Sequence, residues 1–125
     1  MTARKQKNAL VCCPPKPALE DRKLISLEKA GELMHLFKML ANDTRLRLLH
    51  ALARSGEMCV KDLADTMEMK PQAVSNQLQR LVDRGILVGT RNGNNVHYRI
   101  VDPCVLNLLE QGLCLMEDAE GRSRK

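Results

Sequence analysis

Aromatic side chains and long apolar runs are scarce in this chain of 125 residues. It has one tyrosine, one phenylalanine and no tryptophan. That composition argues against a binder of single-stranded nucleic acid, because such proteins stack bases on exposed aromatic rings. No apolar run is long enough to span a bilayer, and the N-terminal residues lack an apolar signal core. We therefore expect a cytoplasmic protein with no membrane partner.

Two signatures of catalysis are also missing, a glycine-rich phosphate- or oxyanion-binding loop and a Cys-x-x-Cys pair. A small thiol reductase would need an activated nucleophile in such surroundings, so the sequence argues against an enzyme. The chain does have five cysteines. In a reducing compartment, an odd number of cysteines indicates metal ligands, redox sensors or plain thiols rather than structural disulfides.

The clearest motif is a pair of short amphipathic helices joined by a tight polar turn in residues 62–81. The apolar residues recur at helical spacing, as Leu63, Ala64 and Met67 in the first helix and Val74, Leu78 and Leu81 in the second. Pro71 suits the first turn of the second helix, where its missing N–H costs nothing. The second helix turns polar groups outward that can read base edges or hold phosphates: Gln72, Ser75, Asn76, Gln77 and Arg80. This pattern predicts a helix-turn-helix, and the net charge of +5 favours a polyanionic partner.

The rest of the chain divides into an arm, a domain and a tail. Residues 1–17 are basic and proline-rich, which predicts a flexible arm. Residues 18–118 form the domain, and residues 119–125 are a charged tail expected to be disordered. Within the domain, helical stripes predict one helix from about Ala18 to Leu40 and another that Asn42 or Asp43 caps and Gly56 ends.

A β-hairpin and a last helix follow the second helix of the motif. Asn92-Gly93 is a strong turn signal between two strand-like runs, so we expect a wing that carries Arg91 and Arg99 to the DNA. Asp102-Pro103 begins a final helix that is too apolar to face water on all sides. Pairing of the terminal helices between two copies would bury them and relate two reading helices by a two-fold axis. The expected fold is therefore a mainly α winged helix-turn-helix, homodimeric through its terminal helices, on an inverted repeat of double-stranded operator DNA.

The residues 37–49, 57–64, 74–81 and 85–87 together resemble the ArsR/SmtB family of metal-responsive repressors. The resemblance runs from about Glu32 to Met116. It implies a dimeric winged-helix repressor that sits on its operator when metal-free and leaves when metal binds. In thiolate-sensing members the N-terminal arm supplies ligands to the cysteine at the position of Cys59. The match therefore groups Cys12, Cys13 and Cys59 as a three-sulfur site.

The residues themselves bear on that site and on its ion. Adjacent cysteines in a Lys- and Pro-rich arm have no packing reason to exist, although a chance pair is the alternative, and Cys59 alone is as often a small buried residue. Three thiolates suit a thiophilic ion. We rank As(III) and Sb(III) first, Hg(II) second, and Cd(II) or Pb(II) third, since Lys61 stands where the family's cadmium and lead sensors have another cysteine.

Two alternatives stay open. The last helix carries a possible mixed-thiolate site at the dimer interface, made of Asp102, Cys104, Cys114 and Glu117. The step from Cys104 to Cys114 is one residue shorter than the family spacing, which rotates the second thiol away from the first, and both cysteines would otherwise pack in the dimer core. The other alternative is a thiol-redox repressor of the same fold, in which Cys12, Cys13 or Cys59 is oxidised.

Overall fold

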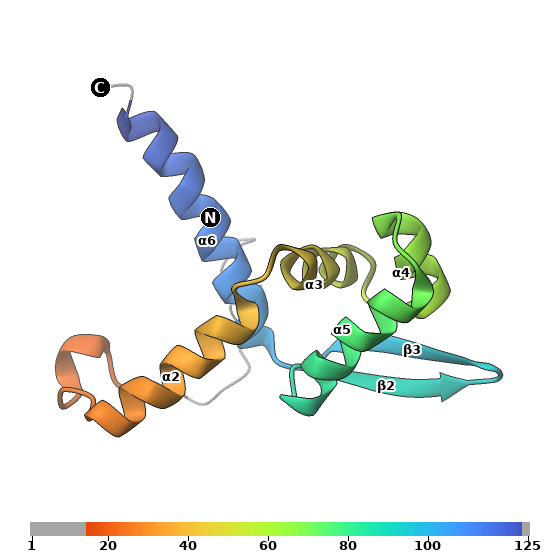
Figure 1. The fold of residues 1–125 in the computed structure, drawn as a ribbon. Helices are drawn as coiled ribbons and strands as arrows, with labels where there is room; N and C mark the ends of the chain where they lie inside the picture. Colours follow the sequence, from red (N-terminus) through yellow and green to blue (C-terminus); the bar gives the residue numbers. More distant parts are fainter. Residues whose placement is uncertain (1–14, 124–125) are drawn as a thin grey trace.

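The computed structural model describes residues 15–123, and side chains within that range up to residue 119. The elements in chain order are the 3-10 turn η1 (Leu19–Asp21), helices α2 (Leu27–Leu40) and α3 (Asp43–Ser55), strand β1 (Met58–Cys59), helices α4 (Val60–Met67) and α5 (Pro71–Asp83), strands β2 (Leu87–Asn92) and β3 (Asn95–Ile100), and helix α6 (Pro103–Ser123). Helices α2 and α6 project from one end of the molecule, and the β2–β3 hairpin extends at the other (Figure 1).

The strands form an antiparallel sheet in the order β1-β3-β2. Strand β2 pairs with β3 along the whole hairpin, from Leu87 opposite Ile100 to Asn92 opposite Asn95. Gly93 lies at the turn with a φ of 68°, a left-handed conformation that glycine adopts at no steric cost. The predicted wing is therefore confirmed. The short strand β1, which the sequence did not reveal, pairs with the edge of β3 that β2 does not occupy.

Apolar side chains of α3, α4 and α5 meet in the core that holds the helix-turn-helix in place. Leu48, Leu63 and Leu78, one from each helix, have no exposed surface. Helix α5 also packs against β2, and α3 packs against β3. The predicted inward faces of both helices of the motif are confirmed, since every apolar residue assigned to them is buried: Leu63, Ala64, Met67, Val74, Leu78 and Leu81.

Local signals set most helix ends where the sequence indicated. The Asn42 side chain accepts a hydrogen bond from the backbone N–H of Arg45 and caps α3. Gly56 ends that helix with a φ of 86°. Pro71 opens α5. Asp102 caps α6, because its Oδ1 accepts from the backbone N–H of Cys104 at 3.0 Å.

Two boundaries differ from expectation. The prediction that the first long helix begins near Ala18 is wrong: α2 begins at Leu27, after Ser26, whose hydroxyl oxygen accepts from the N–H of Lys29. The hydrogen bond at the serine cap stabilises a helix start at this point, and the apolar residues before Ser26 do not extend the helix backwards. At the other end, α6 runs to Ser123, beyond the boundary predicted at residue 118. Among the described helices, none combines the length and apolarity needed to cross a membrane.

Candidate nucleic-acid interface and thiol sites

Helix α5 is held by one face and presents the other to solvent. Val74, Leu78 and Leu81 are fully covered, which fixes the rotation of the helix about its axis. As a result, three of the predicted DNA-binding residues are exposed and two are half-buried: Gln72, Asn76 and Arg80 in the first group, Ser75 and Gln77 in the second. A polar face of this kind on the second helix of a helix-turn-helix suits the major groove.

The amide side chains of this face are already hydrogen-bonded. Gln72 Nε2 donates to Asn76 Oδ1 at 3.1 Å along the exposed face of the helix. Gln77 is bound differently, because its Oε1 accepts from Nη1 of Arg45 on α3 at 2.9 Å. Arg45 is not among the residues that the sequence predicts to contact DNA. Nothing in the local pattern marks it, since its partner lies in another helix.

The wing places its two predicted DNA-binding arginines on opposite faces. Arg91 pairs with Val96 and Arg99 pairs with Val88. Side chains alternate between the faces of a strand, so a residue opposite Val96 and a residue three positions after Val96 point to different sides. Both arginines are exposed. A duplex lying against one face of the hairpin would therefore meet one of these two side chains.

Cys59 lies where the wing meets the helix-turn-helix. It ends β1, precedes α4 as its N-cap residue, and is opposite His97 of β3 in the sheet register. Its side chain is buried, with 8% of its surface exposed. His97 Nδ1 is 3.4 Å from Glu57 Oε2, so a polar pair that the sequence pattern does not indicate lies beside strand β1, which carries the thiol. Cys12 and Cys13 lie outside the described residues.

The thiols of α6 differ in their surroundings. Cys104 is half-buried in the first turn of the helix, and Cys114 is exposed, with its Sγ 3.7 Å from Asp118 Oδ2. Glu117 is exposed. The two cysteines are ten residues apart in the sequence, which corresponds to about 15 Å along a helix. One ion therefore cannot bind both thiols of the same chain.

Among the described side chains, those of residues 15–119, no group of three or more His, Cys, Asp or Glu comes together to hold a metal. The described part of one chain thus offers single thiols rather than a complete coordination sphere. A full site needs either the arm or a second copy of the chain.

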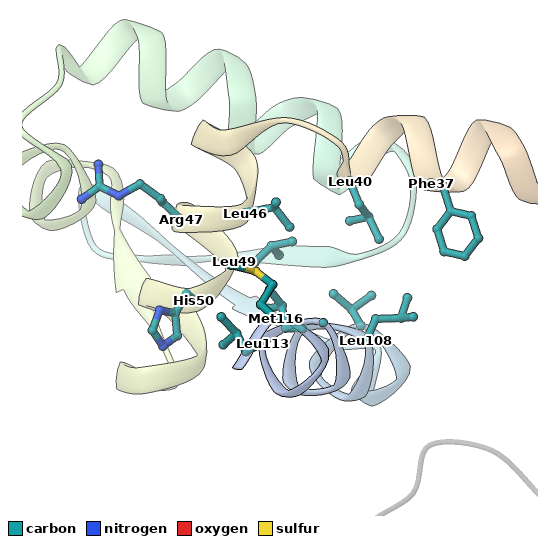
Figure 2. A pocket seen from close by; sticks show the side chains of 12 residues that line it. Phe37, Leu40, Leu46, Arg47, Leu49, His50, Leu108, Leu113 and Met116 are labelled. Carbon is teal, nitrogen blue, oxygen red and sulfur yellow. The ribbon is translucent and has the colours of Figure 1, made fainter. Parts of the chain in front are cut away.

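An apolar face is left uncovered at the end of the molecule that carries α2 and α6. A cavity of about 430 Å³ lies between α2, α3 and α6, and Figure 2 shows Phe37, Leu40, Leu108 and Leu113 around it. Phe37 and Leu113 remain 49% and 45% exposed. Exposed apolar patches often mark surfaces that contact another protein.

Comparisons with known proteins agree with the fold. A family model described as a helix-turn-helix domain matches residues 40–90. The transcriptional repressor SmtB homolog of Synechocystis is 41% identical over 70% of this chain and 66% of its own length. The arsenic resistance regulator ArsR1 of Pseudomonas putida is 42% identical over 52% of this chain and 51% of its own length. The matched segments thus span about half to two-thirds of these two relatives.

Two solved structures extend the comparison. The antimony-specific transcriptional repressor AntR is 69% identical and has a TM-score of 0.74, with coverage of 88% of this chain and 99% of that one. A homodimeric winged helix-turn-helix DNA-binding domain of Mycobacterium bovis is 30% identical with a TM-score of 0.63, over 78% and 92% of the two chains.

The cadmium resistance regulator CadC of Listeria innocua is 33% identical over 66% of this chain and 69% of its own length. These relatives are transcriptional regulators rather than enzymes, which confirms the expectation of a non-enzyme. With the winged fold, the buried helix-turn-helix face and these identities together, the chain belongs to the ArsR/SmtB family of winged helix-turn-helix transcriptional repressors.

Proposed function

We propose that this protein is a homodimeric repressor that binds an inverted repeat of double-stranded operator DNA and is released by a thiophilic ion, with trivalent antimony or arsenic as the inducer. The observation that carries the proposal is the position of Cys59. Cys59 is the N-cap residue of α4, the first helix of the helix-turn-helix, and its strand β1 pairs with strand β3 of the wing. A ligand bound there acts on both DNA-contacting parts at once.

The uncovered apolar face supports the dimer. The large half-exposed side chains of α2 and α6 surround a cavity that a second copy can fill. A two-fold dimer built on this face places two copies of α5 on the same side of the assembly, as an inverted repeat requires. The similar domain from Mycobacterium bovis is described as homodimeric, which supports a homodimer for this fold.

The thiols support the choice of ion. As(III) and Sb(III) bind three sulfurs, and the site that we propose brings Cys12 and Cys13 of the arm to Cys59. Cys59 is buried, so the arm must displace part of its cover before the ion is enclosed. That rearrangement would couple ion binding to the position of α4. A coupling of about 4 kcal/mol lowers the affinity of the dimer for the operator by about 10³-fold.

The helix α6 is the alternative location of the site. Cys114 is exposed and Cys104 half-buried, so both are more accessible than Cys59. Because the two thiols of one chain are too far apart to share an ion, such a site would join Cys104 to Cys114 of the partner subunit, with Asp102 and Glu117 nearby. Asp102 already caps α6, and binding an ion would compete with that hydrogen bond.

An assay of operator release distinguishes the two locations of the inducer site. It compares four proteins: wild type, Cys12→Ser/Cys13→Ser, Cys59→Ser, and Cys104→Ser/Cys114→Ser. Antimonite and arsenite are expected to release wild-type protein, and the first two variants are expected to stay bound. If only the last variant stays bound, the inducer site lies on α6. Release of every variant by either ion contradicts both thiol sites. Release by peroxide in metal-free buffer, with no effect of either ion, would instead identify a redox repressor.

A further inference from the structure

Arg45 ties together three parts of the molecule. Its backbone N–H donates to Asn42 Oδ1 at the start of α3, and its Nε donates to the backbone oxygen of Met39 in the last turn of α2 at 2.6 Å. Its Nη1 donates to Gln77 Oε1 in the middle of α5 at 2.9 Å. The end of α2 is thus linked to α5, the helix that faces DNA in the proposed function, through the single side chain of Arg45.

The direction of this link is fixed by chemistry. A guanidinium group has donors only, so the atom of Gln77 that faces Arg45 must be the amide oxygen. Both side chains are half-buried, so water competes with the bond less than at the surface. The Gln72–Asn76 bond on the same helix has neither property, because it joins two exposed amides that can exchange roles.

We propose that Arg45 and Gln77 form a strut that fixes the orientation of α5 relative to α2, and that Gln77 positions the reading helix instead of reading a base. Apolar packing of α5 through Val74, Leu78 and Leu81 is strong but not directional. A hydrogen bond is directional, so the strut resists small rotations that packing alone allows.

The consequence concerns the spacing of the two half-sites. This step depends on the proposed function, in which α2 belongs to the dimer interface and two copies of α5 contact one operator. The distance between those copies then depends on the angle of α5 to α2 in each subunit. The separation of half-sites in the DNA is a geometric match to that distance. A dimer with intact struts accepts one spacing, and a dimer without them tolerates neighbouring spacings.

The test measures the affinity of ion-free protein for its selected operator and for operators with the spacer one base pair longer or shorter. The operator is first selected from randomised DNA with wild-type protein. The variants that remove the strut are Gln77→Met, Arg45→Met and the double substitution. Gln77→Glu keeps an acceptor for Arg45. Gln79→Met is the matched control, because Gln79 lies on the same helix and bonds to Asp83 within it.

Wild-type protein, Gln77→Glu and Gln79→Met are expected to discriminate strongly between spacings, even though the added charge of Gln77→Glu weakens binding to every operator. Each methionine variant at position 45 or 77 is expected to lose about tenfold of that discrimination. The double variant is expected to lose no more than either single one, because both remove the same bond. Gln77→Met retains the Arg45–Met39 bond, so it carries the test if Arg45→Met unfolds.

Three results would overturn the strut. Equal weakening on all spacings would make Arg45 and Gln77 merely structural. A changed base preference at one position of the half-site in Gln77→Met, with unchanged spacing preference, would make Gln77 a base reader. Additive losses of spacing discrimination in the double variant would show that Arg45 and Gln77 act independently. The spacing experiment uses no inducer, so a failure of antimonite to release DNA would contradict the proposed function and leave the strut untouched. A protein that selects no DNA would contradict both the proposed function and the strut.

Discussion

Replacement of Phe37 by alanine is expected to dissociate the dimer and leave each subunit folded. Phe37 is the single phenylalanine of the chain and is 49% exposed beside the cavity between α2, α3 and α6. A phenylalanine side chain presents about 200 Å² in total, so about 100 Å² is left for a partner to cover. At about 25 cal/mol per Å², this amounts to about 2.5 kcal/mol per subunit.

A two-fold axis repeats the loss, so the proposed dimer is expected to lose up to about 5 kcal/mol, which raises its dissociation constant by up to about 10³–10⁴-fold. Sedimentation equilibrium over a range of protein concentrations measures this constant, and circular dichroism checks that helix content is kept. Val101→Ala is the control, since Val101 is 41% exposed and does not line the cavity. An unchanged dissociation constant in Phe37→Ala would show that α2 is not part of the interface.

Three further outcomes follow from the wing and from helix backbone geometry. The slope of log affinity against log salt is expected to fall by about one for either Arg91→Ala or Arg99→Ala but not for both, because the two side chains lie on opposite faces of the hairpin; equal falls would show that the DNA contacts both faces. Gly89→Ala is expected to lower the free energy of unfolding by about 1 kcal/mol, because a Cβ there would lie 3.0 Å from the side chains of Tyr98 and Val96, which must shift to accommodate it. Gly31→Ala is expected to raise it by about 1 kcal/mol, since α2 leaves open space at that position. Thermal unfolding of both variants checks these opposite signs, and a loss of stability in Gly31→Ala would contradict the second.

Sequence patterns predicted the elements whose signals are local. Val74, Leu78 and Leu81 recur at helical spacing and are fully buried, and Asn42, one of the two predicted cap residues, caps α3. The hairpin was predicted from Asn92-Gly93. In the structure Gly93 lies at the turn with a positive φ, and Asn92 ends β2 opposite Asn95.

Features that depend on distant residues were not visible in the sequence. Strand β1 has two residues and exists because Met58 and Cys59 pair with β3, far along the chain. The bond from Arg45 to Gln77 joins residues that are 32 positions apart. The start of α2 was misplaced because Leu24 continues an apolar stripe, yet it is 95% exposed and lies before the Ser26 cap.

The candidate thiol site was likewise predictable from the sequence only in part. Residue type and spacing selected all the cysteines, and the structure adds the depth of Cys59 and the separation of Cys104 from Cys114 along one helix. Which thiols meet depends on how the arm and a second subunit are placed. That placement is a property of the assembly and carries no periodic signal in one chain.

The most direct measurement of the central claim is the affinity of the protein for antimonite with and without saturating operator DNA. If capture of the ion by thiolates is incompatible with the DNA-bound dimer, the operator must weaken antimonite binding by the same factor by which antimonite weakens operator binding. The account predicts a factor of about 10³ in both directions. Equal antimonite affinity in the free and operator-bound protein would contradict it.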